Sequence, residues 1–66
     1  MTNKEINQMW AKAETMAENI YIAHLMGIGL EQAKKDQQSL RLLVQMAREY
    51  GFIYNGQYDE YLNMKL

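Results

Sequence analysis

Hydrophobic residues near the start of the chain recur at alternating steps of three and four positions, which is the spacing of one face of an α-helix. The residues on this face are Ile6, Met9, Ala13, Met16, Ile20 and Ala23. Trp10, Ala17 and His24 widen the face on one side, as a helix that faces a core requires. The same steps form the heptad pattern by which helices pack along their length. The pattern therefore predicts a helix over residues 3–26.

Both ends of this first helix carry local signals. Thr2 is followed three residues later by Glu5, which is the spacing of a capping box at a helix start. Gly27 is a typical residue for the position just after a helix end. A helix of residues 3–26 would be about 35 Å long at 1.5 Å per residue. Its hydrophobic face is longer than one partner helix of about 20 residues would cover.

A second helical pattern occupies the middle of the chain. Its hydrophobic residues are Leu40, Leu43, Val44, Ala47 and Tyr50. Gln37 stands where this face calls for a hydrophobic side chain, and Asp36 offers an alternative helix start there. We favour one helix over residues 30–50, because "EQAKKDQQ" is rich in good helix formers. Gly51 would end it, and Phe52 would fold back on it in a Schellman motif.

Two local rules conflict in the remaining stretch, "FIYNGQYDEYLNMKL". Asn55 and Gly56 are a strong signal for the turn of a β-hairpin. Asn55 is also a good helix N-cap, and Asp59 and Glu60 would then lie in the first turn, where the helix dipole favours acidic groups. An isolated two-stranded hairpin is marginally stable in water. We therefore expect a short helix over residues 56–64.

The expected fold is all-α, with residues 1–66 as one domain. The link "GIG" between the two long helices is short, so they should be antiparallel neighbours. A chain of 66 residues buries only about 60% of its unfolded surface and needs additional stabilisation. The sequence has no cysteine and one histidine, which excludes disulfides and the usual Cys/His zinc site. We therefore expect self-association, with a dimer favoured, into a helical bundle.

Aromatic and small residues are the candidates for contact with a second copy or another protein. Three of the five tyrosines lie between residues 54 and 61, and tyrosine is enriched at contact surfaces. Alanines on the first helix would allow close approach of another backbone. The predicted interface residues are Trp10, Ala13, Ala17, Tyr21, Tyr54, Tyr58 and Tyr61. The alternative is that the tyrosines only cover the core of the chain.

The sequence offers little for catalysis. His24 is the one residue whose ordinary pKa lies near neutrality, and it has no cysteine or second histidine to work with. Glu14 and Glu18, and likewise Asp59 and Glu60, are interpreted as solvated surface pairs. We expect no enzymatic activity, no cofactor and no metal site.

Two alternative functions remain as hypotheses. Gly29 opens a helix N-terminus, and such ends bind anions, with Lys34 and Lys35 one turn further on. An oligomer holding an anionic ligand such as a nucleotide is therefore the first alternative. The glycine turn between two helices also suggests a helix-turn-helix DNA-binding module. Seven basic and eight acidic residues give a net charge of −1, which disfavours nucleic acid as a partner.

The leading hypothesis is a small helical protein that acts by binding proteins, itself first. Chains of this size and composition are common among phage and mobile-element accessory proteins, which often inhibit a host protein by occlusion. Inhibition or modulation of a partner is therefore part of the hypothesis. No hydrophobic stretch approaches the length of a membrane span, and "MTNKEINQMW" lacks the core of a signal peptide. We expect a cytoplasmic protein with no membrane contact.

Overall fold

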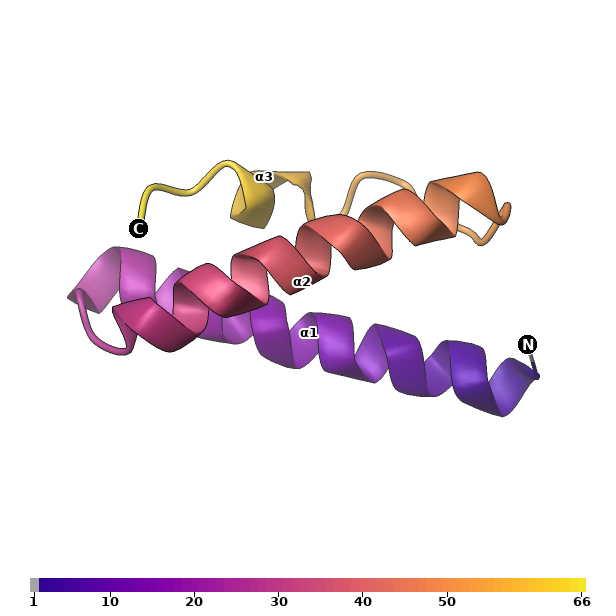
Figure 1. Cartoon of the computed structure of the whole chain (residues 1–66), viewed down its shortest axis with the longest axis horizontal. Helices are drawn as coiled ribbons and strands as arrows, with labels where there is room; N and C mark the ends of the chain where they lie inside the picture. The colour runs from indigo at the N-terminus through magenta and orange to yellow at the C-terminus, as the bar shows by residue number, and fades with distance from the viewer. Residues whose placement is uncertain (1) are drawn as a thin grey trace.

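Two long helices lie side by side in a computed structural model that describes residues 2–66 (Figure 1). Helix α1 comprises Asn3–Met26, α2 comprises Leu30–Glu49, and the short α3 comprises Asp59–Leu62. The chain reverses between α1 and α2, so the two form an antiparallel hairpin, and α3 returns along it. No strand occurs between residues 2 and 66. The prediction of an all-α fold is confirmed, and the β-hairpin alternative is excluded.

The ends of the long helices follow the local signals. The Glu5 backbone N–H donates to Thr2 Oγ1 at 3.2 Å at the start of α1. At the end of α2, Gly51 has a φ of 72°, and the Phe52 N–H donates to the Ala47 carbonyl at 2.9 Å. That hydrogen bond closes the expected Schellman motif. Helix α2 also runs without a break through Asp36, so the alternative start there is not used.

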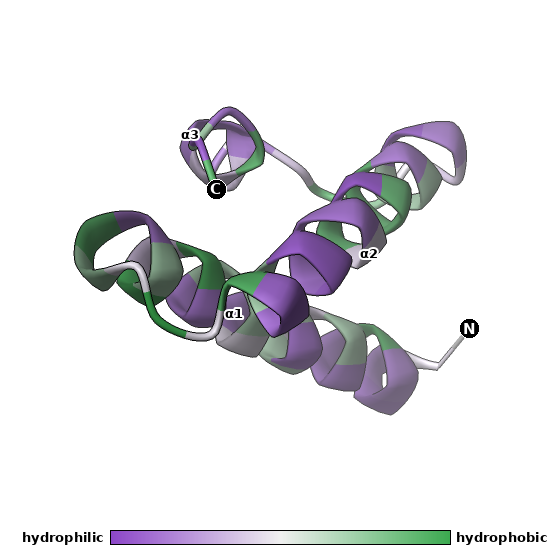
Figure 2. Cartoon of the chain, turned by 60° about the vertical axis from the view of Figure 1, so that its left-hand side comes forward, coloured by the Kyte–Doolittle hydropathy of each residue, from purple (hydrophilic) through white to green (hydrophobic). Residues whose placement is uncertain are grey.

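The core between α1 and α2 is built mainly from small residues. Its buried members are Ala13, Ala17, Ile20, Ala23, Ala33, Leu40, Val44 and Ala47. Ile20 and Leu40 are the largest side chains that are fully buried. The small alanine side chains allow the two helix backbones to pack closely, and hydrophobic and hydrophilic positions alternate along each helix (Figure 2). A core of this size leaves the larger aromatic side chains to cover its edge.

Helix α3 is shorter than predicted, because residues 56–58 form a turn instead of a first helical turn. Gly56 has a φ of 79°, in the left-handed region, and its carbonyl accepts the Asp59 N–H at 3.1 Å. Asn55 does not cap the helix; its own N–H donates to Gln57 Oε1 at 2.7 Å. The helix therefore begins at Asp59 and not at Gly56.

The other end of α3 is fixed by α2. Gln37 Nε2 donates to the backbone carbonyls of Tyr61 at 3.0 Å, Leu62 at 3.3 Å and Met64 at 2.9 Å. Arg41 Nη2 donates to the Leu62 carbonyl at 3.0 Å. These side chains supply donors to carbonyls at and just after the end of α3, where a helix leaves backbone carbonyls without intrahelical partners. Gln37, which interrupts the hydrophobic pattern of α2, is thus the residue that holds the chain end.

None of the helices formed by residues 2–66 combines the length and the hydrophobicity needed to cross a membrane.

Candidate functional site

The C-terminal segment, residues 52–66, lies over one flank of the helical hairpin and brings tyrosines against α1. The Trp10 ring is 6.3 Å from the Tyr54 ring, with 11° between the planes, and 6.1 Å from the Tyr58 ring, with 21° between them. Tyr54 and Tyr58 are themselves 6.4 Å apart at 24°. The three rings, called here the aromatic cluster, are stacked in the offset manner that aromatic side chains prefer. They cover the edge of the alanine-rich core.

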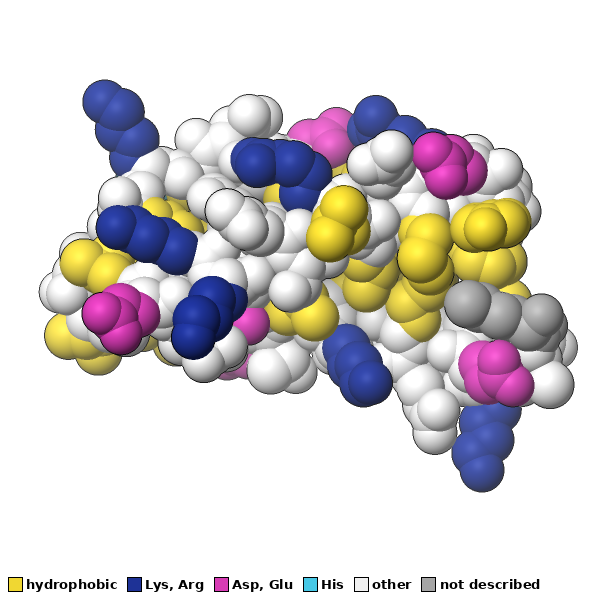
Figure 3. Space-filling view, viewed as in Figure 1, with side chains coloured by type: hydrophobic (Ala, Val, Ile, Leu, Met, Phe, Trp, Pro, Cys, Tyr) yellow, Lys and Arg dark blue, Asp and Glu magenta, His cyan; other side chains and the backbone are white. Residues whose placement is uncertain are grey.

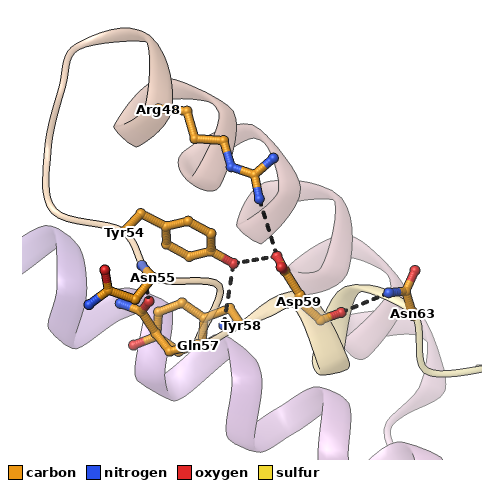
Figure 4. A network of polar contacts seen from close by, with 7 residues as sticks. All are labelled: Arg48, Tyr54, Asn55, Gln57, Tyr58, Asp59 and Asn63. Atoms are coloured by element: carbon orange, nitrogen blue, oxygen red, sulfur yellow. Dashed lines mark hydrogen bonds and ion pairs between the residues drawn. The ribbon is translucent and has the colours of Figure 1, made fainter.

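A polar network fixes the aromatic cluster from the side of α2 (Figure 4). The Tyr54 hydroxyl donates to Asp59 Oδ1 at 2.6 Å and accepts the Tyr58 N–H at 3.3 Å. Arg48 Nη2 lies 3.5 Å from the same carboxylate oxygen, and the guanidinium stands 5.1 Å from the Tyr54 ring centre. Asn63 Nδ2 donates to the Asp59 carbonyl at 3.0 Å. The polar groups of this network are therefore engaged in holding the segment in place.

Burial raises the pKa of both tyrosines in the aromatic cluster. For Tyr54 the second cause is its hydrogen bond to Asp59, and for Tyr58 it is the negative charge of Glu14. Each effect disfavours the phenolate. Both phenols therefore stay protonated well above neutral pH.

Beside the aromatic cluster lies an open groove of about 330 Å³ between α1 and α3, called here the tyrosine groove. Its lining residues are Glu14, Ala17, Glu18, Tyr21, Tyr58 and Tyr61. The Tyr21 and Tyr61 rings meet edge to face at 6.5 Å and 79°, and Tyr58 and Tyr61 are 6.3 Å apart. The groove therefore combines aromatic rings with two carboxylates.

Five of the predicted interface residues gather on this flank. Trp10, Tyr54, Tyr58 and Tyr61 are partly buried in it, and Tyr21 is the most exposed of the five. Ala13 and Ala17, by contrast, are 0% and 4% exposed within the single chain. Other parts of the same chain therefore cover most of both alanines.

The predicted anion-binding residues do not converge on one site. Gly29 precedes α2 with a φ of 66°, and Lys34 and Lys35 are exposed on the helix. The groove that includes Gly29 is lined otherwise by Asn19, Ile22, Ile28 and Gln32, and by neither lysine. The structure therefore adds no feature that favours an anionic ligand there.

Sequence reasoning missed the residues that anchor the C-terminal segment and those that make the groove acidic. His24 Nδ1 lies 2.9 Å from the Lys65 carbonyl, to which it donates, so it ties the chain end to α1. Glu14 and Glu18 were treated as a solvated pair. The steps from Glu14 to Glu18 and from Glu18 to Tyr21, four and three residues, do indicate a shared helix face. Nothing in the sequence indicates that Tyr58 and Tyr61 lie opposite them.

Residues 2–66 contain no group of three or more His, Cys, Asp or Glu side chains placed to hold a metal ion. Comparisons of the chain with protein-family models, with curated proteins and with solved structures found no match.

Proposed function

We propose that this protein acts by binding protein surfaces, that its first partner is a second copy of itself, and that it is not an enzyme. The proposal rests on a hydrophobic face of the hairpin that the C-terminal segment leaves uncovered.

This face lies on the flank opposite the aromatic cluster. Successive residues of an α-helix are about 100° apart, so Met9 and Met16 lie about 100° around α1 from Trp10 and Ala17. On α2, the residues that bond the C-terminal segment are on one flank and a row of hydrophobic side chains is on the other. The open face, as we call it, consists of the exposed Met46 and Tyr50 and of the partly buried Met9, Met16 and Leu43. Met16 and Leu43 also pack against the core. Figure 3 shows hydrophobic side chains gathered between the two long helices.

The exposed surface of the chain is larger than expected for a compact monomer, as it would be if part of the core were completed by a partner. Its accessible area is 4860 Å² for 7.8 kDa. The size scaling of monomeric proteins gives about 4,400 Å² for that mass. Its radius of gyration is 12.0 Å, with extents of 36 × 19 × 15 Å. A compact domain of this length would have a radius of gyration of about 10.8 Å. An elongated hairpin with a hydrophobic side has the shape expected of one half of a helical bundle.

Two open faces packed together would give a four-helix bundle. A standard interface buries about 800 Å² on each partner. The open face covers residues 9–16 of α1 and residues 43–50 at the end of α2, at the end of the hairpin away from the turn between them. Methionine is common on such a surface because its flexible side chain adapts to a partner. Dimerisation of this kind also supplies the stabilisation that a core of alanines lacks.

A second exposed hydrophobic patch supports contact with a further protein. The last residues of α1, Leu25 and Met26, and Ile28 in the turn that follows are all exposed. This hairpin tip lies at the end of the long axis and away from the middle of the open face (Figure 1). It is the surface that a dimer would leave for a partner whose activity the protein inhibits or modulates.

Sedimentation equilibrium with two matched variants tests the self-association. Met46 is 37% exposed on the open face, and Leu25 is 62% exposed on the hairpin tip. We expect the wild-type chain to be a dimer at micromolar concentration. Met46→Lys should be a monomer of unchanged helix content, and Leu25→Lys should remain a dimer. A folded wild-type monomer, or equal behaviour of the two variants, would refute the proposal.

A further inference from the structure

We propose that the tyrosine groove binds an organic cation, namely an alkylated ammonium or guanidinium group. This inference goes beyond the proposed function, because it concerns a ligand on the opposite flank of the hairpin from the open face.

The first observation is an uncompensated pair of negative charges. Glu14 and Glu18 are one helical turn apart, where like charges repel each other. No basic residue lies three or four positions from either of them in the sequence. Among residues 2–66 the one ion pair is Arg48 with Asp59, so neither glutamate is neutralised by another part of the described chain. A bound cation would remove this repulsion.

The second observation is the set of aromatic rings around those carboxylates. Tyr21, Tyr58 and Tyr61 line the same groove, and neighbouring rings are 6.3 to 6.5 Å apart. The faces of aromatic rings attract a cation that comes within about 6 Å, and clusters of such rings are how proteins recognise quaternary ammonium groups. Rings set at 79° and 49° to one another can surround a rounded group better than parallel rings can.

The groove also fits the size of such a group. Its volume of about 330 Å³ lies at the lower end of the range for small-molecule sites, about 300–1,000 Å³. It is open on one side, so it can accept either a free ion or the end of a side chain. A free quaternary amine and a methylated lysine of a peptide present the same chemistry to it.

Titration followed by nuclear magnetic resonance tests the proposal on the whole chain. The two probes are tetramethylammonium chloride and a short peptide that carries trimethyllysine, at constant ionic strength. We expect saturable shifts of the signals of residues 14–21 and 58–61 with at least one probe. The probe that binds more tightly identifies the source of the cation. tert-Butyl alcohol, which is of similar size and neutral, should cause no saturable shift.

Three variants separate a specific site from general attraction of cations to an acidic protein. Glu14→Gln combined with Glu18→Gln should weaken binding about fivefold or more. Glu31→Gln combined with Glu49→Gln removes the same charge elsewhere and should leave binding unchanged. Tyr21→Leu, at an exposed ring that the core does not need, should weaken binding about two- to fivefold.

Absence of saturable binding by both probes would overturn the inference, as would equal weakening by the two glutamine double variants. Binding of the neutral alcohol as tight as that of the ammonium ion would do the same. None of these results depends on the oligomeric state, because the groove and the open face are on different flanks. Circular dichroism of each variant shows whether it is folded.

Discussion

The hydrophobic pattern and the tertiary structure predict opposite effects on stability when Gln37 is replaced by leucine. The pattern of α2 calls for a hydrophobic residue at this position, so Gln37→Leu would complete the face and stabilise the helix. In the structure, the amide nitrogen donates to three carbonyls at the end of α3. The substitution would remove this donor from all three carbonyls. The Leu62 carbonyl would keep Arg41, and the Tyr61 carbonyl would keep the Met64 N–H at 3.4 Å.

The size of the effect follows from the hydrogen bonds lost and the hydrophobic burial gained. The amide has two hydrogens, and a neutral hydrogen bond contributes about 1 kcal/mol net, so the loss is about 2 kcal/mol. Leucine at a partly buried position recovers about 0.8 kcal/mol for each methylene group that it newly buries. We therefore expect Gln37→Leu to lower the free energy of unfolding by about 1 kcal/mol, out of about 3–10 kcal/mol for a chain of this length.

Urea denaturation followed by two signals measures this effect. Trp10 is the one tryptophan, and it stacks on Tyr54 and Tyr58, so its fluorescence reports whether the C-terminal segment is docked. Circular dichroism reports mainly α1 and α2. The fluorescence midpoint of the variant should fall more than the dichroism midpoint, at one fixed protein concentration.

The matched control is Gln38→Leu, which makes the same change at the next, exposed position. We expect this control to leave both midpoints nearly unchanged. A Gln37→Leu variant as stable as the wild type, or more stable, would refute the role that we assign to the amide.

Three further predictions concern the network around Asp59. Gly56→Ala should destabilise the chain by about 1 kcal/mol or more, because φ at this residue is 79° and the new Cβ would lie 2.9 Å from Asp59 Oδ2. In a chain that already carries Asp59→Ala, the same substitution should lower the denaturation midpoint by less. Asp59→Ala should lower the free energy of unfolding by about 1–2 kcal/mol, because the Tyr54 hydroxyl loses its acceptor. Arg48→Gln removes only an exposed ion pair and should lower it by less than about 1 kcal/mol in the same denaturation assay. The pKa values of Tyr54 and Tyr58 are raised above 10.0 in the folded chain, so their contribution to stability should be complete below pH 10.0 and lost as the pH rises through the folded values. Denaturation midpoints across that range should fall less steeply for Tyr54→Phe, and an equally steep fall would contradict the assignment.

The long helices could be predicted from the sequence because their determinants are local. The periodic hydrophobic face, the Thr2 cap and the glycines after each helix act within a few residues of the backbone they control. The predicted bounds of α1 agree with the structure, and those of α2 differ by one residue at its end. The Schellman motif at Gly51 is confirmed for the same reason.

The extent of α3 and the makeup of the tyrosine groove were decided by the tertiary structure. Helix α3 ends where Gln37 and Arg41, more than twenty residues earlier in the chain, take its carbonyls. Ala13 and Ala17 are buried within the single chain, because small side chains allow neighbouring segments to pack closely there. Glu14 meets Tyr58 only after the C-terminal segment folds back. Helix caps and hydrophobic periodicity depend on a residue's near neighbours in the sequence. The contacts of α3 and of the tyrosine groove depend on where distant segments pack, and a local sequence pattern carries no information about that packing.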